Sequence, residues 1–465
     1  MSYFNGTSTD LGSQAGAELE KAMSAGYGTD SAAFVDGRAL IKEDVESTLV
    51  NVTAELKEDA KVFNSLKKEM AGSTVHEYNK KLNQGDYKHL SVAEGAATRE
   101  TSSNYKREVL PMKYIQTMRS VTLQMESVKG FANAYAEQKI DAIESLVKAA
   151  EHQIFQGNSA VIPTEFDGLP TLIKADKGSY VKDARGASIA SLGESLFDDA
   201  AQEVFTRGGD LTRALYPSVL AKDIKALFSD KFRYIPQQTT NLSFKAIPDY
   251  APAIGGNIQL SGSNAGADKY FRVKGIVQAE GDPTHRPNAP TSVTATQVEG
   301  AAGSKFSGTN AGTYQYTVHA VNAAGISAGT AVAAGAVVAA KDGVKLTITP
   351  STSGEPATGF IICRSAKDGT QVMEMCQIAN SGNETTEFVD LNTDLPGTAS
   401  LILLSDGRVQ PILKWAQLMP AQTFPLFPTN SAVKPFLTLL YGALELNAPK
   451  FCAMYDNLAY NGGLY

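Results

Sequence analysis

The segment that decides the fold is residues 131–157, FANAYAEQKIDAIESLVKAAEHQIFQG. Its apolar side chains recur in alternate steps of four and three, at Ala136, Ile140, Ile143, Val147, Ala150 and Ile154. That spacing puts one apolar stripe along a helix whose other faces are charged or polar. Gly157 is suited to end such a helix. The sequence therefore predicts a long helix that lies on a surface, with no catalytic motif around it.

Composition places the chain among ordinary globular proteins. Its 465 residues are enough for two to four domains, and 43% are hydrophobic and 20% charged. The net charge of −7 argues against a general nucleic-acid coat or a polybasic membrane clamp. No apolar run reaches the roughly 18 residues of a membrane span, and the N-terminus lacks the pattern of a signal peptide. We therefore expect synthesis and folding in a cytoplasm.

The first 122 residues divide into two parts of opposite charge bias. Residues 1–72 hold 12 Asp/Glu against 7 Lys/Arg and include a helix expected at 41–70. Residues 73–122 hold 8 Lys/Arg against 5 Asp/Glu. There STVHEYNKKL and VLPMKYIQTMRSVTLQM alternate in the manner of strands, on either side of a polar segment that cannot form a core. We expect a long two-stranded excursion, which is marginal in water unless it lies on something else.

Two further helices are expected after the long one. The first covers 188–207, with Ser191 and Glu194 at capping-box spacing and Gly208 and Gly209 at its end. The second covers 218–230. Together with the intervening strands, these helices favour an α+β body.

From about Pro283 the composition changes, and residues 288–400 read as all-β. Six or seven alternating segments fit into about 110 residues, and Lys367, Asp368 and Gly369 mark a hairpin turn. This density of strands is typical of an Ig-like or fibronectin-type sandwich. Because α+β character resumes at Leu401, the sandwich is expected to be inserted into a parent domain.

Residue patterns for catalysis or metal binding are absent from the sequence. None of the five histidines, His76, His89, His152, His285 and His319, has ligand spacing with another His, Cys or carboxylate. Cys363 and Cys376 could meet across adjacent strands, but we favour three buried free thiols, with Cys452 as the third. The glycine-rich 253–266 is interpreted as a loop rather than a phosphate cradle, and 390–395 resembles a calcium loop only loosely. We expect no catalytic, cofactor-binding or metal-binding residues, and no enzyme.

The order of these parts resembles the major capsid proteins of tailed bacteriophages, which have the Hong Kong 97 (HK-97) fold. The resemblance is strongest to those of large contractile-tailed phages of Gram-positive hosts, which carry an Ig-like insertion at the corresponding place. It is carried by short strings in a fixed order: GYG at 26–28, STVHEYN at 73–79, EFDGL at 165–169, DARGAS at 183–188, AKDGVKLTI at 340–348 and LYGALELNAPK at 440–450.

The resemblance implies an α+β HK-97-type fold whose parts we place by residue number. They are an N-terminal arm (N-arm, 1–72), an E-loop hairpin (73–122), a P-domain with the spine helix (123–185), an A-domain (186–285), the Ig-like insertion (286–400), an A-domain return (401–430) and a P-domain return (431–465). Some members of the fold form Lys–Asn crosslinks between subunits. We do not expect them here, although Lys80, Lys81 and Lys88 lie in the hairpin.

The implied function is that of a structural head protein. The subunit would self-assemble as hexamers and pentamers into an icosahedral shell around packaged phage DNA, within the host bacterial cytoplasm, and end in the virion. Expected partners are other copies of the chain, a portal and other minor head proteins, with weak non-specific contact to DNA and none to a membrane. The alternative is a virion surface or tail adhesion protein whose Ig-like domain binds host glycans.

Overall fold

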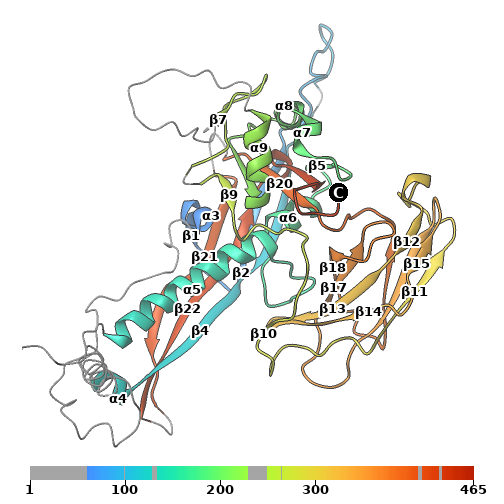
Figure 1. The fold of residues 1–465 in the computed structure, drawn as a ribbon. Helices are drawn as coiled ribbons and strands as arrows, with labels where there is room; N and C mark the ends of the chain where they lie inside the picture. Colours follow the sequence, from blue (N-terminus) through green and yellow to red (C-terminus); the bar gives the residue numbers. More distant parts are fainter. Residues whose placement is uncertain are drawn as a thin grey trace, which may run out of the picture.

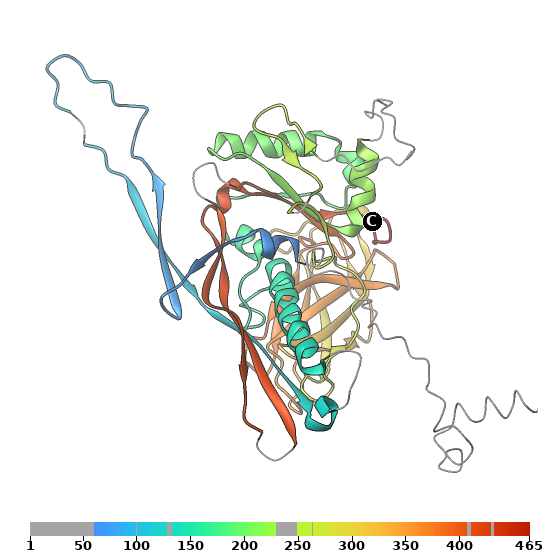
Figure 2. The same ribbon diagram turned by 90° about the vertical axis from the view of Figure 1, so that its left-hand side faces the viewer.

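The structure is a computed structural model that describes residues 60–98, 100–127, 133–228, 249–262, 264–406, 411–428 and 432–465. Figure 1 shows a long helix lying along a long-stranded sheet, a second sheet with short helices above it, and an all-β unit at one side. A thin hairpin projects far from the body, as Figure 2 shows from another direction. This is the α+β architecture that the sequence predicts.

The long helix is α5 (Ala134–Gln156). The side chain of Asn133 caps its start by accepting hydrogen bonds from the backbone N–H groups of Tyr135 and Ala136. Gly157 follows its end, but at φ −59°, so that residue is not in the left-handed conformation. Glycine is needed there for another reason: a Cβ would lie 2.6 Å from the Gln153 oxygen and closer still to the Phe166 oxygen.

The predicted stripe is correct only in the second half of α5. Val147, Ala150 and Ile154 are buried, together with Leu146 and Phe155, which the stripe omitted. Ile140 is instead 52% exposed, and Ala136 is exposed as well. The sheet and the neighbouring helices cover the C-terminal half of the helix, whereas its first turns leave apolar surface open in a single copy.

The sheet along α5 has the order β1-β21-β22-β4, with β1 parallel to its neighbour. Its strands are β1 (Lys67–Met70), β21 (Leu413–Pro425), β22 (Val433–Leu446) and β4 (Lys113–Thr122). The core between sheet and helix is centred on Trp415, the single tryptophan of the chain, which is fully buried. Its ring makes edge contacts with Phe63 and Phe166, at centroid distances of 5.1 and 5.3 Å.

The second sheet has the order β5-β23-β20-β6-β8-β7, with β9 also paired to β6. Its strands are β5 (Tyr180–Asp183), β23 (Ala453–Leu458), β20 (Ala399–Leu404), β6 (Arg213–Pro217), β8 (Ile258–Gln259), β7 (Asp249–Tyr250) and β9 (Gly266–Asp268). The accompanying helices are α6 (Leu169–Ala175), α7 (Ile189–Leu192), α8 (Ser195–Thr206), the 3-10 turn η3 (Ser218–Leu220) and α9 (Ala221–Leu227).

Three helix predictions need correction. The helix expected at 188–207 is broken at Gly193, whose φ of 69° no helix accommodates, and Ser188 rather than Ser191 caps its first part. The helix expected at 41–70 lies mostly outside the described residues. Within them, α3 (Lys61–Ser65) ends early and Lys67–Met70 is the strand β1, because pairing with β21 overrides helix propensity. The helix expected at 218–230 begins as η3, and its last two residues are not described.

The projecting hairpin consists of β2 (Val75–Asn83) and β3 (Asn104–Pro111), joined by residues 84–103, whose described part (84–98 and 100–103) forms no strand. The sequence predicted one excursion over 73–122, and its last fifth was placed wrongly. Lys113–Thr122 is β4, which pairs with β22 in the sheet along α5. The hairpin is therefore shorter than expected, and β3 leads almost directly into that sheet.

The all-β unit (Figure 1) contains a five-stranded sheet, β10-β14-β13-β17-β18, and a three-stranded sheet, β11-β16-β19, with a small β12-β15 pair. The strands are β10 (Glu280–Gly281), β11 (Ser292–Val298), β12 (Gly312–Tyr314), β13 (Tyr316–Asn322), β14 (Gly325–Ala331), β15 (Ala336–Val338), β16 (Gly343–Thr349), β17 (Gly359–Ser365), β18 (Val372–Ala379) and β19 (Thr386–Asp390). The six segments expected to alternate contain β11, β12, β13, β16, β17, β18 and β19, whereas β10, β14 and β15 were not predicted. The strands surround their own core. We call this unit the insertion; its Ig-like identity and the boundaries of all the domains stay predictions.

Candidate functional site

The described residues contain no group of three or more His, Cys, Asp or Glu side chains placed to hold a metal ion. The loosely calcium-like 390–395 instead supplies Asp390 and Asn392 to the buried Arg364 guanidinium, at 2.6 and 2.7 Å. Cys363, Cys376 and Cys452 are free thiols, and burial raises the pKa of the Cys452 thiol to about 12. In the described part of the chain, no helix has both the length and the apolar character of a membrane span.

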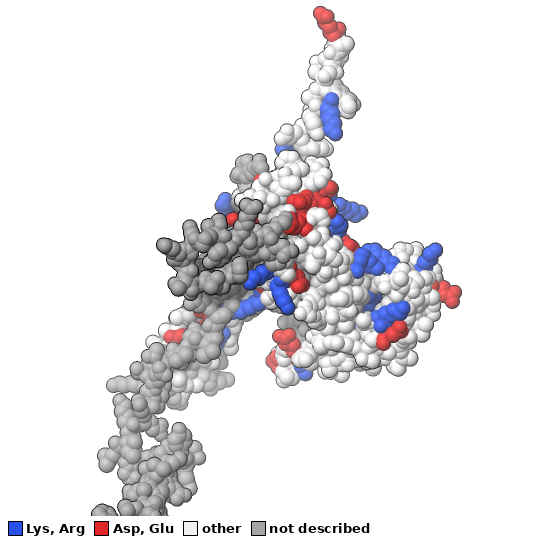
Figure 3. Space-filling view, turned by 45° about the horizontal axis from the view of Figure 1, so that its top comes forward, with Lys and Arg blue, Asp and Glu red and all other residues white. Residues whose placement is uncertain are grey.

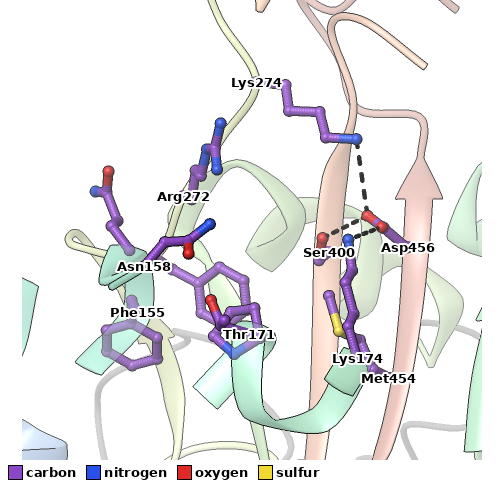
Figure 4. A pocket seen from close by; sticks show the side chains of 12 residues that line it. Phe155, Asn158, Thr171, Lys174, Arg272, Lys274, Ser400, Met454 and Asp456 are labelled. Carbon is purple, nitrogen blue, oxygen red and sulfur yellow. Dashed lines mark hydrogen bonds and ion pairs between the residues drawn. The ribbon is translucent and has the colours of Figure 1, made fainter. Parts of the chain in front are cut away.

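The most developed polar site is a joint between the body and the insertion. Figure 4 shows Lys174, Ser400 and Lys274 converging on the carboxylate of Asp456 beside a cavity of about 70 Å³. The Asp456 oxygens lie 2.5 Å from Lys174 Nζ, 2.8 Å from Ser400 Oγ and 3.9 Å from Lys274 Nζ. Burial alone would raise the pKa of Asp456, but the two ammonium groups hold it well below its ordinary value. The carboxylate is thus fixed as an anion that ties α6, β20 and β23 together.

Asn457, the next residue, connects four segments through one side chain. Its Nδ2 donates to Asp183 Oδ1 at 2.8 Å and to the Thr393 oxygen at 3.0 Å. Its Oδ1 accepts from the Leu395 N–H at 3.0 Å and from Lys274 Nζ at 3.1 Å. The residue is 2% exposed and has φ +56°, a conformation that Asn adopts more readily than most residues. Every polar atom of the amide is therefore satisfied.

Further polar contacts hold the insertion directly to the body. Arg272, which precedes the insertion, forms an ion pair with Glu374 on β18. Lys305 Nζ lies 2.8 Å from Asp183 Oδ2, and Arg185 Nη1 donates to the Asn392 oxygen at 2.6 Å. The Arg272 contact comes from the segment that leads into β10, and the other two come from residues at the end of β5. The insertion is therefore bonded to the body at several separate positions.

An apolar contact completes the joint. Val161, in the loop after α5, packs in one cluster with Val321, Ile361 and Cys363 of the five-stranded sheet. A Cβ at Gly359 would lie 2.5 Å from Val161 Cγ1, so glycine is required for this close approach. All seven residues of β17 are buried. One face of this sheet therefore packs on the insertion core and the other on the body.

Besides the first turns of α5, the described part of a single copy has two larger open surfaces, and the first is the hairpin. Its base is held by a contact of 3.4 Å between His76 Nε2 and Glu445 Oε2, and by a 3.4 Å bond from Lys80 Nζ to the Leu446 oxygen. Beyond the base, Tyr105 is 69% exposed and Tyr87, in the unpaired tip, is 76% exposed. Figure 3 shows the hairpin standing clear of the body.

Of the lysines named for crosslinking, Lys81 and Lys88 are exposed, and Lys80 is partly buried. Lys80 and Lys81 both line a pocket that also contains Glu445 and Asn447. The absence of crosslinks stays a prediction.

The second open surface is the far end of the long sheet, which we call the sheet tip. It consists of the ends of β4, β21 and β22 and the short helix α4 (Leu123–Ser127). Met118 of β4 and Phe424 of β21 lie on either side of Leu437 of β22, because both are its cross-strand partners. Phe427 is 94% exposed. The other exposed apolar side chains here are Met118, Leu123, Met125, Phe424 and Leu426. A cluster of this kind on a soluble protein marks an interaction site.

The comparisons with known proteins find capsid proteins of bacteriophages. Residues 23–250 match the model of the SU10 major capsid protein family. The major capsid protein of Staphylococcus phage K is 25% identical over 95% of both chains, and the putative major capsid protein of Enterococcus phage phiEF24C is 26% identical over 95% of both. The chain is a bacteriophage major capsid protein. It is therefore a component of the virion.

Solved structures with related architecture also include capsids. The capsid of a native GTA particle matches with a TM-score of 0.44 and 10% identity, over 93% of this chain and all of that one. The holo-SrpI encapsulin complex of Synechococcus elongatus matches with a TM-score of 0.39 and 10% identity, over 94% of this chain and all of that one. Both likenesses are weak. The parts described above, a projecting hairpin, a spine helix on a long sheet and a second sheet with helices, are those of the HK-97 fold.

Sequence reasoning missed the joint. The segment that holds Asp456 and Asn457, AMYDNLAY, is apolar on both sides of the two polar residues. An adjacent Asp and Asn in an otherwise apolar segment could have indicated a buried polar site, because buried polar groups need hydrogen-bond partners. Those partners come from positions up to about 280 residues away, and no spacing rule reveals them.

We expect Asn457→Ala to destabilise the unassembled capsid subunit by about 2–4 kcal/mol, because two partners lose an acceptor, two lose a donor and alanine disfavours the positive φ. A thermal melt of the purified chain measures the loss. The matched control is Asn288→Ala, since Asn288 also donates two hydrogen bonds, to Ser353, but is exposed. Equal melting temperatures for the two variants would show that the joint does not contribute to the stability of the subunit.

Proposed function

We propose that this capsid protein closes an icosahedral shell of hexamers and pentamers around packaged phage DNA, and that its hairpin and sheet tip are the parts completed by other copies. The observation that carries the proposal is the exposure of both surfaces in one subunit. The hairpin has only two strands, and the described part of residues 84–103 forms no strand. Two strands alone are marginally stable in water, so a neighbouring surface is needed to order them.

Burial of apolar side chains supplies the energy for these contacts. Fully burying a side chain such as Phe427 or Tyr87 contributes about 1.5–3 kcal/mol. Charged pairs on the hairpin, such as Arg107 with Glu77 at 3.2 Å, are exposed and each contributes only about 0–1 kcal/mol. The apolar surface therefore provides most of the affinity, and repetition over many copies multiplies it.

The insertion is proposed to act structurally, with its three-stranded sheet available for contact with an adjacent capsomer. A glycan-binding face would need exposed aromatic rings. The five aromatic residues of the insertion, Phe306, Tyr314, Tyr316, Phe360 and Phe388, are all buried or partly buried in its core. We therefore favour the structural role over host attachment. Contacts with a portal and other minor head proteins are further expectations, as is only weak contact with DNA, because the chain is acidic.

Replacing residues 84–103 by a short Gly-Ser turn should abolish closed shells while the subunit still folds, because β2 and β3 keep their own ladder. Electron microscopy of the expressed protein counts shells, and circular dichroism checks the fold. The matched control replaces 84–103 by a Gly-Ser segment of equal length. It keeps the length of the loop but removes the apolar side chains of Tyr87, Leu90 and Val92. Normal shells from the shortened hairpin would contradict its role between subunits.

Phe427→Asp should lower shell yield at least tenfold, because each neighbouring copy would have to bury a carboxylate in place of a ring. The melting temperature of the unassembled subunit should not change, since the ring is 94% exposed there. Phe427→Leu keeps an apolar side chain and should assemble nearly as well as the wild type. Equal yields from the Asp and Leu variants would exclude the sheet tip from the assembly contacts.

A further inference from the structure

The two sheets of the insertion end in edge strands, and β19 is the least protected of them. A strand at the edge of a sheet presents unpaired N–H and C=O groups. At one edge of the five-stranded sheet, β10 has only two residues, and at the other edge the Glu374 N–H of β18 donates to the Gly275 oxygen at 2.8 Å. In the three-stranded sheet, β11 lies against β15. In the described part of the chain, β19 pairs with β16 alone.

The backbone of β19 is open on the side away from β16. Among the described residues, Glu387, Phe388 and Val389 form no backbone hydrogen bond outside the ladder with β16. The segment TEFVD contains no proline, and its one exposed charge, that of Glu387, is neutralised by Lys345 Nζ at 2.7 Å. Proline and unpaired lysine, which commonly protect an edge from pairing, are therefore missing from this strand.

Two apolar side chains of β19 are incompletely covered within one copy. Val389, on the outer face of the three-stranded sheet, is 41% exposed. Phe388 packs against the core of the insertion but is only partly buried. A strand added at this edge would cover both side chains and would bond the open backbone groups.

We propose that β19 of one copy pairs antiparallel with β19 of a second copy, so that two three-stranded sheets join into one six-stranded sheet across adjacent capsomers. This inference rests on the proposed function, since it takes a neighbouring capsomer as the partner. A strand that pairs with its own copy forms a two-fold interface, in which the same surface serves both sides. Each strand brings a balanced Lys345–Glu387 pair, so the contact does not add net charge.

The side chains of β19 favour one of the three registers that keep most of the strand paired. Opposite residues of an antiparallel pair face the same side of the sheet, so the two-fold axis passes through a residue. An axis at Glu387 would oppose two carboxylates, and an axis at Val389 would place Phe388 against Asp390 of the second copy. An axis at Phe388 opposes two phenyl rings, which is a favourable cross-strand pair, and places Glu387 opposite Val389. The pairing is therefore centred on Phe388.

Disulfide formation in assembled shells tests the pairing and its register. Glu387→Cys and Val389→Cys chains are co-expressed, oxidised mildly and separated on a non-reducing gel. The mixture should form about fivefold more disulfide dimers than either variant alone, because unlike positions lie directly opposite whereas like positions are too far apart for a disulfide. The matched control mixes Thr294→Cys with Thr296→Cys, two exposed positions with the same spacing on β11. The native cysteines are present in every sample.

Two charge substitutions at Val389 give a second readout. Within one copy residue 389 lies opposite Lys345, so the unassembled Val389→Glu subunit should melt at a higher temperature than Val389→Lys. Between copies residue 389 lies opposite Glu387, so shells of Val389→Lys should dissociate at a higher temperature than shells of Val389→Glu. The two orders are opposite, and subunit stability therefore does not explain the result expected for shells.

Closed shells in which the mixture crosslinks no more than the β11 control would overturn the inference and leave the proposed shell function intact. Equal crosslinking by the single variants and the mixture would also overturn it, because the register at Phe388 would be wrong. If the wild type forms no shells, the proposed function fails first and the inference fails with it. If a cysteine variant does not assemble, the order of the two Val389 variants in shells decides.

Discussion

The amide of Asn457 is the contact on which the arrangement of this capsid subunit depends. It bonds β23 to the β5 end, to the segment before the insertion and to the segment after it, while the adjacent Asp456 adds α6 and β20. Buried polar groups of this kind stabilise only when every partner is present. The body and the insertion therefore keep one relative position.

Some parts of the subunit are packed completely within one copy, whereas others leave apolar surface for neighbouring copies to cover. Trp415, Phe63 and Phe166 make a core that needs no partner. Phe427, Tyr87 and the first turns of α5 expose apolar surface that no part of the described chain covers. A subunit built only for stability would bury these side chains. Their exposure is consistent with a protein whose function is to be one of many copies in a virion.

Sequence reasoning recovered the fold from local patterns and failed where distant segments meet. The spine helix, most strands of the insertion and the projecting hairpin were predicted from periodicity, because each period reflects one backbone geometry. Lys67–Met70 was assigned to a helix and β4 to the hairpin. The local sequence does not show that the first of these segments pairs with β21 and the second with β22. Ile140 was placed in the buried stripe because spacing shows a face but not what lies against it. The joint was missed for the same reason, because it is made by residues far apart in the chain.

Hydrogen exchange compared between unassembled subunits and closed shells tests the central claim most directly. We predict that the backbone amides around Asn457 exchange slowly in both, because the joint is complete in one copy. The amides of 84–103 and of the sheet tip should exchange fast in the free subunit and become protected in the shell. Slow exchange of these two surfaces in the free subunit, with no change on assembly, would contradict the account.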